Sequence, residues 1–192
     1  SDRVIVTLVN AYNDDMNVLP TNRIIRGKPI DDDRFIKKIK GRFDIEKKSS
    51  AAELLNEMDQ RRSSDTINLG VLTRVGNAYL LSYKGKKNWT SDLSTASHTL
   101  DVNVLHQLIL KPACGIDTRN QNDLGYLGYI RGNEPPLEMI KNVSDYDFVF
   151  FVNPPDLDQI FDVAETGETM PQKSTYFYPK VYSGLVTAGI GD

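Results

Sequence analysis

The sequence predicts an α+β fold: a single domain with a mixed β-sheet and amphipathic helices packed on it. Two observations lead to this prediction. Segments typical of strands are interleaved with amphipathic segments typical of helices, and the two kinds do not alternate strictly. The composition, 40% hydrophobic and 26% charged over 192 residues, is that of an ordinary globular chain with room for a sizeable core.

Six runs rich in β-branched and aromatic residues are expected to be strands. They lie at residues 4–12, 18–26, 67–74, 78–83, 126–131 and 148–152. The second run contains Pro20, which is natural at a bend or a sheet edge. Val75-Gly76-Asn77 joins the third and fourth runs as a hairpin, because glycine and asparagine tolerate positive φ. The last run is apolar on both faces, which favours a central strand.

Five segments with apolar residues at helical spacing are expected to be helices. They lie at residues 31–40, 50–58, 101–111, 136–143 and 153–167. Acidic residues at 31–33 cap the first and match its dipole, which explains them better than a metal site does. Ser50 and Glu53 form a capping box for the second, and Pro112 is expected to end the third. The last follows strand 148–152, so that together they resemble half of a βαβ unit, whereas the polar stretch 84–97 is expected to be a long loop.

Charge and cysteine content exclude several classes of function. The net charge of −3 and the scattered basic residues give no electrostatic footprint for nucleic acid. One cysteine and two histidines allow neither an internal disulfide nor a cysteine-rich zinc site, so no metal site is predicted. A reducing, cytoplasmic location is the default for such a chain. No apolar run is long enough to span a bilayer, and we expect no membrane partner.

The stretch GETMPQKSTYFYPK, residues 167–180, nearly matches the phosphate loop G-x-x-x-x-G-K-[ST]. That loop follows a strand and cradles phosphate with backbone N–H groups, which glycines allow to point inward. Here the preceding element is a predicted helix, Pro171 lacks an N–H, and Gln172 replaces the glycine. A phosphate loop is therefore disfavoured.

What remains is an extended segment that is dense in hydrogen-bond donors. Alternation would place Lys173 and Thr175 on one side of a strand and Ser174 on the other. Lys173 beside two hydroxyls suits a phosphate or a carboxylate. A terminal strand with packed aromatic residues and solvated lysines explains the same pattern, and composition alone does not decide between the two.

Three other residues suggest chemistry of their own. Asp101 and His106 could form an acid–base pair, but Asp101 is also a good helix cap and lies off the face of His106. Cys114 has no basic neighbours that would activate it, so we interpret it as an inert residue at a helix end.

Four pieces of the chain resemble the uncharacterised family catalogued as domain of unknown function 1015. They are VLPTNRII (18–25), LDVNVLHQLIL (100–110), FVNPPDLDQIFDVAETGETMPQKST (151–175) and MPQKSTYFYPKVYSGLV (170–186). The family commonly has Pro-Thr-His-Arg where this chain has Pro20-Thr21-Asn22-Arg23. If that histidine acts as an acid or base, Asn22 cannot replace it, because an amide does not titrate, but a purely hydrogen-bonding role would survive.

The resemblance implies that residues 1–192 form a single C-terminal domain of a longer protein. Full-length relatives carry an N-terminal half similar to ParB and sulfiredoxin domains, with an Asp-Gly-His-His-Arg motif that is absent here. The expected partners are that missing half and a phosphorylated or carboxylate small molecule.

Two functions follow by analogy. The first is part of a cytoplasmic nucleotide- or phosphate-dependent small-molecule enzyme, similar to a phosphotransferase and linked to serine metabolism; the second is a regulatory or interaction module, or a scaffold for the N-terminal half. The cofactor stays open, with ATP or ADP as candidates for the full-length protein, and no catalytic residue is assigned. The candidate anion- or substrate-binding residues are Arg23, Gln172, Lys173, Ser174, Thr175 and Lys180.

Overall fold

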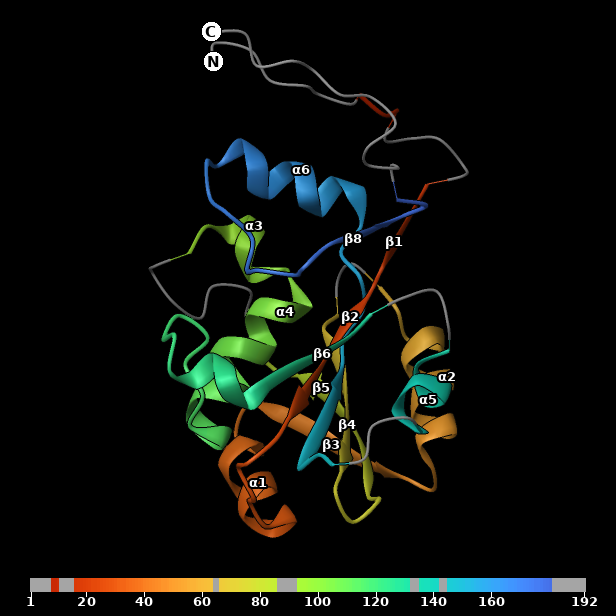
Figure 1. The fold of residues 1–192 in the computed structure, drawn as a ribbon, viewed down its shortest axis with the longest axis vertical. Helices are drawn as coiled ribbons and strands as arrows, with labels where there is room; N and C mark the ends of the chain where they lie inside the picture. The colour runs from red at the N-terminus through yellow and green to blue at the C-terminus, as the bar shows by residue number, and fades with distance from the viewer. Residues whose placement is uncertain are drawn as a thin grey trace, which may run out of the picture.

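The structure, a computed structural model, describes residues 8–10, 16–63, 66–85, 93–131, 135–141 and 145–180. Its centre is a six-stranded sheet in the order β3-β5-β4-β7-β2-β6 (Figure 1). The strands are β2 (Thr21–Ile25), β3 (Phe43–Lys48), β4 (Asn68–Thr73), β5 (Ala78–Tyr83), β6 (Leu127–Arg131) and β7 (Phe148–Phe151). A second, two-stranded sheet pairs β1 (Asn17–Leu19) with β8 (Tyr176–Tyr178).

The α+β class is confirmed, but the prediction of a mixed sheet is wrong, because every pairing between the described strands is antiparallel. A βαβ unit requires the strand after the helix to return to the same sheet in parallel. After β7 the chain forms a helix and then β8, which pairs with β1 outside the main sheet. The central position predicted for the strand at 148–152 is correct, since β7 lies between β4 and β2.

Helices cover both faces of the main sheet and one of its ends (Figure 1). They are α1 (Asp32–Ile39), α2 (Ala51–Gln60), α3 (Thr95–His98), α4 (Asp101–Val104), the π-helix η1 (Leu105–Cys114), the 3₁₀-helix η2 (Asp123–Tyr126), α5 (Pro136–Lys141) and α6 (Leu157–Glu165). One core lies between the sheet and the helices α1 and η1, and a second between the sheet and the helices α2 and α5. A small apolar cluster, Leu100, Val102 and Val163, holds α6 against α4 and the segment before it.

Most helix boundaries follow from the residues that cap them. Asp31 accepts hydrogen bonds from the backbone N–H groups of the first turn of α1, and Ser50 accepts one from Glu53 N at 3.1 Å. The carboxylate of Glu53 binds Ser49 instead of closing the capping box on Ser50. Gly167 follows α6 with φ of 76°, the left-handed conformation that favours glycine at a helix end.

The helix predicted at 101–111 differs from expectation because it continues through Pro112 to Cys114. Residues 105–114 form a π-helix, whose turn is wider than that of an α-helix. In an α-helix the proline ring collides with the carbonyl four residues earlier, and the wider turn relieves that clash. Gly115, with φ of 65°, ends the helix instead. Cys114 lies at this helix end, as predicted, and is buried.

The donor-rich segment near the C-terminus is a turn instead of a continuous strand. Residues 172–173 form the turn, and β8 begins only at Tyr176. The strand predicted at 4–12 falls mainly outside the described residues, as does part of the loop at 84–97, which ends in α3. Pro20 separates β1 from β2, which fits a proline at a bend.

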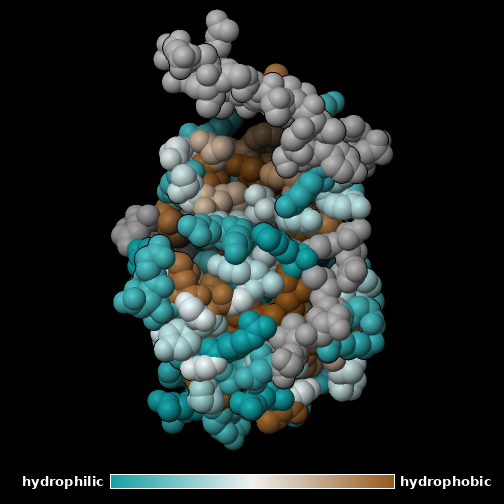
Figure 2. Space-filling view, in the orientation of Figure 1, coloured by the Kyte–Doolittle hydropathy of each residue, from teal (hydrophilic) through white to brown (hydrophobic). Residues whose placement is uncertain are grey.

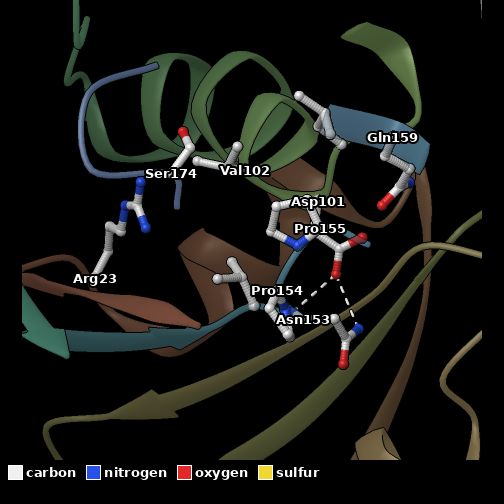
Figure 3. A pocket seen from close by; sticks show the side chains of 10 residues that line it. Arg23, Asp101, Val102, Asn153, Pro154, Pro155, Gln159 and Ser174 are labelled. Carbon is white, nitrogen blue, oxygen red and sulfur yellow. Dashed lines mark hydrogen bonds between the residues drawn. The ribbon is translucent and has the colours of Figure 1, made fainter. Parts of the chain in front are cut away.

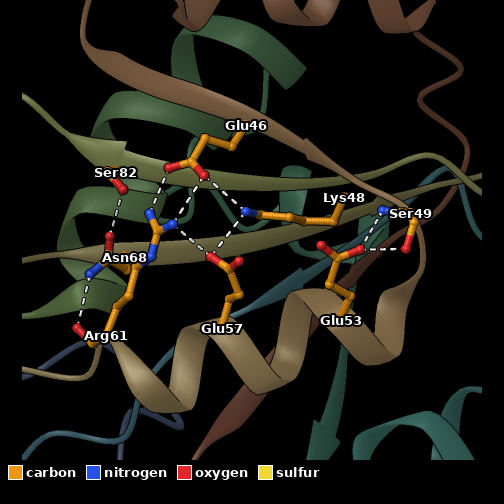
Figure 4. A network of polar contacts seen from close by, with 8 residues as sticks. All are labelled: Glu46, Lys48, Ser49, Glu53, Glu57, Arg61, Asn68 and Ser82. Atoms are coloured by element: carbon orange, nitrogen blue, oxygen red, sulfur yellow. Dashed lines mark hydrogen bonds and ion pairs between the residues drawn. The ribbon is translucent and has the colours of Figure 1, made fainter.

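An ion-pair network ties α2 to the edge strand β3 (Figure 4). Arg61 contacts Glu46 at 2.6 Å and Glu57 at 2.7 Å, and Lys48 contacts the same two carboxylates at 2.8 and 2.9 Å. Hydrogen bonds from Arg61 and then from Lys48 lower the pKa of Glu46 to about 2. The network links the end of α2 to β3 and stabilises the fold locally.

On the face seen in Figure 2, hydrophilic residues surround separate hydrophobic patches, as on ordinary globular domains. Within the described ranges, every helix is too short or too polar to traverse a bilayer.

Candidate anion-binding site

Arg23 is the most unusual residue of the sheet, because it is a fully buried cation. It lies in the middle of β2, opposite Tyr129 of β6 and Phe150 of β7, and is 0% exposed. Its Nη1 donates to the carbonyl of Thr21, whereas Nε and Nη2 have no hydrogen-bond partner among the described residues. Burial lowers the pKa of Arg23 to about 10, so that the guanidinium is still charged at neutral pH.

Arg23 lines a small cavity at the end of the sheet where β7 leaves it (Figure 3). The cavity has a volume of about 20 Å³, and its other walls include Val102, Asn153, Pro154 and Ser174. That volume holds about one water molecule or one oxygen atom of a larger ligand. In Figure 3 the guanidinium points toward the turn that carries Ser174.

A second cation lies beside the same aromatic ring. The Lys173 Nζ is 4.2 Å from the centroid of the Tyr129 ring, and the Arg23 Cζ is 5.4 Å from it. Lys173 has φ of 59°, a left-handed conformation that is uncommon outside glycine, asparagine and aspartate. Residues in such conformations cluster at ligand sites, where the surrounding structure holds them. Two positive groups therefore approach one ring, with Lys173 at the exposed side.

His106 is buried near Arg23 and stays neutral. Its Nδ1 lies 3.1 Å from the hydroxyl of Thr118, and its Nε2 has no partner among the described residues. Burial and then the charge of Arg23 lower the pKa of His106 to about 3. A neutral imidazole does not compensate the charge of Arg23.

Asp101 lines the cavity from the side opposite β2. One oxygen, Oδ2, accepts from the backbone N of Asn153 at 3.0 Å and from its Nδ2 at 2.9 Å (Figure 3). Burial raises the pKa of Asp101 to about 7, against the opposing effect of the bonds from Asn153. The predicted helix-cap role is wrong: the N-cap of α4 is Leu100, and the carboxylate is held by Asn153 instead. Nor do Asp101 and His106 form a pair, since each has a different partner.

The structure brings together three of the six residues that the sequence singled out. Arg23 and Ser174 line the cavity, and Lys173 reaches the Tyr129 ring that Arg23 also approaches. Ser174 is buried, and its Oγ donates to the carbonyl of Pro171 at 2.5 Å, so that only its lone pairs remain for a ligand.

The other three residues do not line that cavity. Gln172 is exposed, Thr175 is half-buried, and the Lys180 Nζ lies 5.2 Å from the ring of Tyr176. Asn22, where the family commonly has histidine, is buried and accepts from the backbone N of Val152 at 3.1 Å. That bond is a structural role which needs no titrating group.

Sequence reasoning placed Asn153 at the start of a helix and missed it as a site residue; α6 begins at Leu157, with Asp156 as its N-cap. The one available signal is position: Asn153 is a polar residue directly after a fully apolar strand and directly before two prolines. Asn153 also donates to the carbonyl of Asn68 at 3.1 Å, which fixes its amide between β4 and α4. Across the described part of the chain, no group of three or more histidine, cysteine, aspartate or glutamate residues could hold a metal ion.

The described residues thus form an α+β domain in which a buried cation, with no carboxylate partner among them, lies beside a small cavity. Residues 1–103 match the sequence model of the family described as "Protein of unknown function (DUF1015)". The chain belongs to that family. The matched part includes Arg23 and Asp101, whereas Asn153 and Lys173 lie outside it. No curated protein and no solved structure matches the chain.

Proposed function

We propose that this chain binds an oxygen of a small phosphorylated or carboxylated molecule at Arg23, with Lys173 as a second cation at the cavity mouth. The site would be one part of a nucleotide- or phosphate-dependent small-molecule enzyme, in which a ParB-like N-terminal half supplies the remainder. ATP and ADP are candidate cofactors of the full-length protein. The binding proposal is supported by geometry. The resemblance alone supports the other parts of the proposal: the split between two halves, the phosphotransferase-like reaction and the link to serine metabolism.

One observation carries the binding proposal: two nitrogens of the buried Arg23 guanidinium, Nε and Nη2, have no hydrogen-bond partner in the part of the chain that the structure describes. A buried charge without a counter-ion is strongly unfavourable, and proteins pair such charges or coordinate ions with them. No described carboxylate forms an ion pair with Arg23, and His106 is neutral. An anionic ligand supplies both the missing charge and the missing acceptors.

The test is the stability of the 192-residue chain in sodium phosphate and in sodium chloride at equal ionic strength. A ligand at ten times its Kd stabilises the folded chain by about 1.4 kcal/mol. For a chain of this length that corresponds to a rise in melting temperature of about 3–6 °C. The measurement in sodium chloride corrects for the general effect of charge screening on stability, because both salts screen surface charges alike at equal ionic strength.

Substitutions then localise the effect. Arg23→Met keeps the apolar stem and removes the charge, so that it should abolish the response to phosphate without lowering stability in chloride. Lys173→Ala should weaken the response. Lys47→Ala is the matched control, because Lys47 is also exposed and lies 6.0 Å from a tyrosine ring, that of Tyr79. An equal phosphate response in wild type and Arg23→Met would refute the proposal.

A further inference from the structure

A larger cleft adjoins the Arg23 cavity. It has a volume of about 510 Å³ and shares four wall residues with that cavity: Asp101, Asn153, Pro154 and Gln159. Clefts that hold small-molecule ligands usually measure about 300–1,000 Å³. The two spaces therefore suit two parts of one compact ligand.

Nine of the ten residues that line the cleft are polar or charged, Pro154 being the exception, whereas most ligand pockets are lined largely by apolar residues. They carry three carboxylates, those of Asp59, Asp101 and Asp156, and one guanidinium, that of Arg62. With the carboxylates ionised, this balance disfavours an anionic group in the part of the cleft remote from Arg23. It favours a neutral body whose groups both donate and accept hydrogen bonds, which is the property of hydroxyl groups.

The wall nearest the cavity is held in position by its own hydrogen bonds. Asn153 binds Oδ2 of Asp101 twice, and in Figure 3 the second oxygen points away from Asn153, toward the side of Gln159. No described residue donates a hydrogen bond to that second oxygen. Gln159 is fixed in turn, because it closes the capping box of α6 with Asp156 and donates to Thr99 O at 3.1 Å. A ligand thus meets an oriented acceptor on a fixed wall.

We propose that the cleft binds the hydroxylated body of a sugar phosphate or a similar polyol phosphate, with one hydroxyl donating to Asp101 and the phosphate oxygen at Arg23. The inference rests on the proposed function, since it takes the anionic end of the ligand to lie at Arg23. It adds the chemical class of the rest of the ligand, and it names Asp101 as the residue that recognises that part. Asp101 is then a specificity-determining residue, because a ligand without the hydroxyl leaves its oriented oxygen unpaired.

The experiment compares three probes by calorimetric titration of the 192-residue chain at pH 8, above the pKa of about 7 of Asp101, so that its carboxylate is ionised. The probes are inorganic phosphate, D-ribose, and D-ribose 5-phosphate. We expect D-ribose 5-phosphate to bind at least tenfold more tightly than phosphate. Asp101→Asn should remove most of that tenfold gain and leave the affinity for phosphate unchanged or higher, because a negative charge is lost. Asp158→Asn, an exposed aspartate of α6 that does not line this cleft, is the control and should keep the gain.

A second variant covers the case in which Asp101→Asn does not fold. Ser63 is exposed at the cleft wall, so that Ser63→Trp should fold normally while its indole fills the cleft. It should abolish the gain and retain phosphate binding. If wild type binds phosphate but binds D-ribose 5-phosphate no more tightly, or if Ser63→Trp keeps the gain, the inference is overturned and the proposed function stands. If phosphate itself does not bind, both are overturned.

Discussion

Replacing Asp101 by asparagine should change how the stability of the chain depends on pH. In the folded chain burial raises the pKa of Asp101 from 3.8 to about 7. Between these two values the folded state keeps a proton that the unfolded state has already lost. Stability therefore falls as the pH rises from about 4 through about 7, and it changes little further above that range.

The magnitude follows from the size of the pKa difference. Each unit corresponds to 1.36 kcal/mol, and a difference of about three units gives an upper value of about 4 kcal/mol. Asp101 is half-buried and lines an open cleft, whose solvent screens the charge in part, so that we expect about 2–4 kcal/mol. At pH 4 the protonated carboxyl group and the asparagine amide have nearly the same shape and no charge. Wild type and Asp101→Asn should then be equally stable.

The assay is urea unfolding of both proteins from pH 4 to pH 8, with the free energy of unfolding extrapolated to water. Asp101→Asn should become more stable than wild type as the pH rises, by about 2–4 kcal/mol at pH 8. All other titrating groups are shared, so their contributions cancel in the difference. Two parallel curves would show that Asp101 titrates alike in the folded and unfolded states, and would refute this reasoning.

Three further predictions concern the fold around the site. Burial lowers the pKa of His106 from 6.5 to about 3. The wild-type protein should therefore lose stability as the pH falls from 6.5 toward 3. Urea unfolding of His106→Gln over the same pH range should show a smaller loss of stability. Glu46→Gln should cost less than about 1 kcal/mol, because the Glu46 side chain is 41% exposed and solvent screens its ion pairs. The difference from wild type should be present above pH 4.5 and vanish as the pH falls to about 2. Gly70→Ala should destabilise the chain by about 1–3 kcal/mol in thermal unfolding, because the added Cβ would lie 2.6 Å from the sulfur of Met58. Gly41→Ala, where a Cβ meets no atom within 4 Å, is its control, and equal melting temperatures for the two variants would contradict the packing account.

The sequence predicted those parts of the fold that depend on neighbouring residues. Ser50, Asp31 and Gly167 act on their own helix ends, and the hairpin at Gly76 joins adjacent strands. These signals are local, so that periodicity and turn chemistry suffice to find them. The class of fold follows from the same elements.

Properties that join distant residues could not be predicted in this way. The insertion of β7 between β4 and β2 makes the sheet antiparallel, and no local pattern specifies that order. Asp101 accepts a hydrogen bond from Asn153, which lies 52 positions later in the sequence. From neighbouring residues alone, a helix cap was the simpler interpretation of Asp101. Arg23 was singled out as a cation for an anion, but its complete burial depends on packing from both neighbouring strands.

The most direct test of the central claim is to locate an oxyanion in a crystal of the protein soaked with sodium selenate, whose selenium scatters anomalously. If the anion binds at Arg23, an anomalous peak should mark the selenium of a bound selenate ion. One oxygen of that ion should lie within about 3 Å of Nε or Nη2 of Arg23. Arg23→Met crystals should lack that peak. A carboxylate of the chain bonded to Nε and Nη2, with selenate absent from the cavity, would show that the charge of Arg23 is already compensated and would contradict the claim.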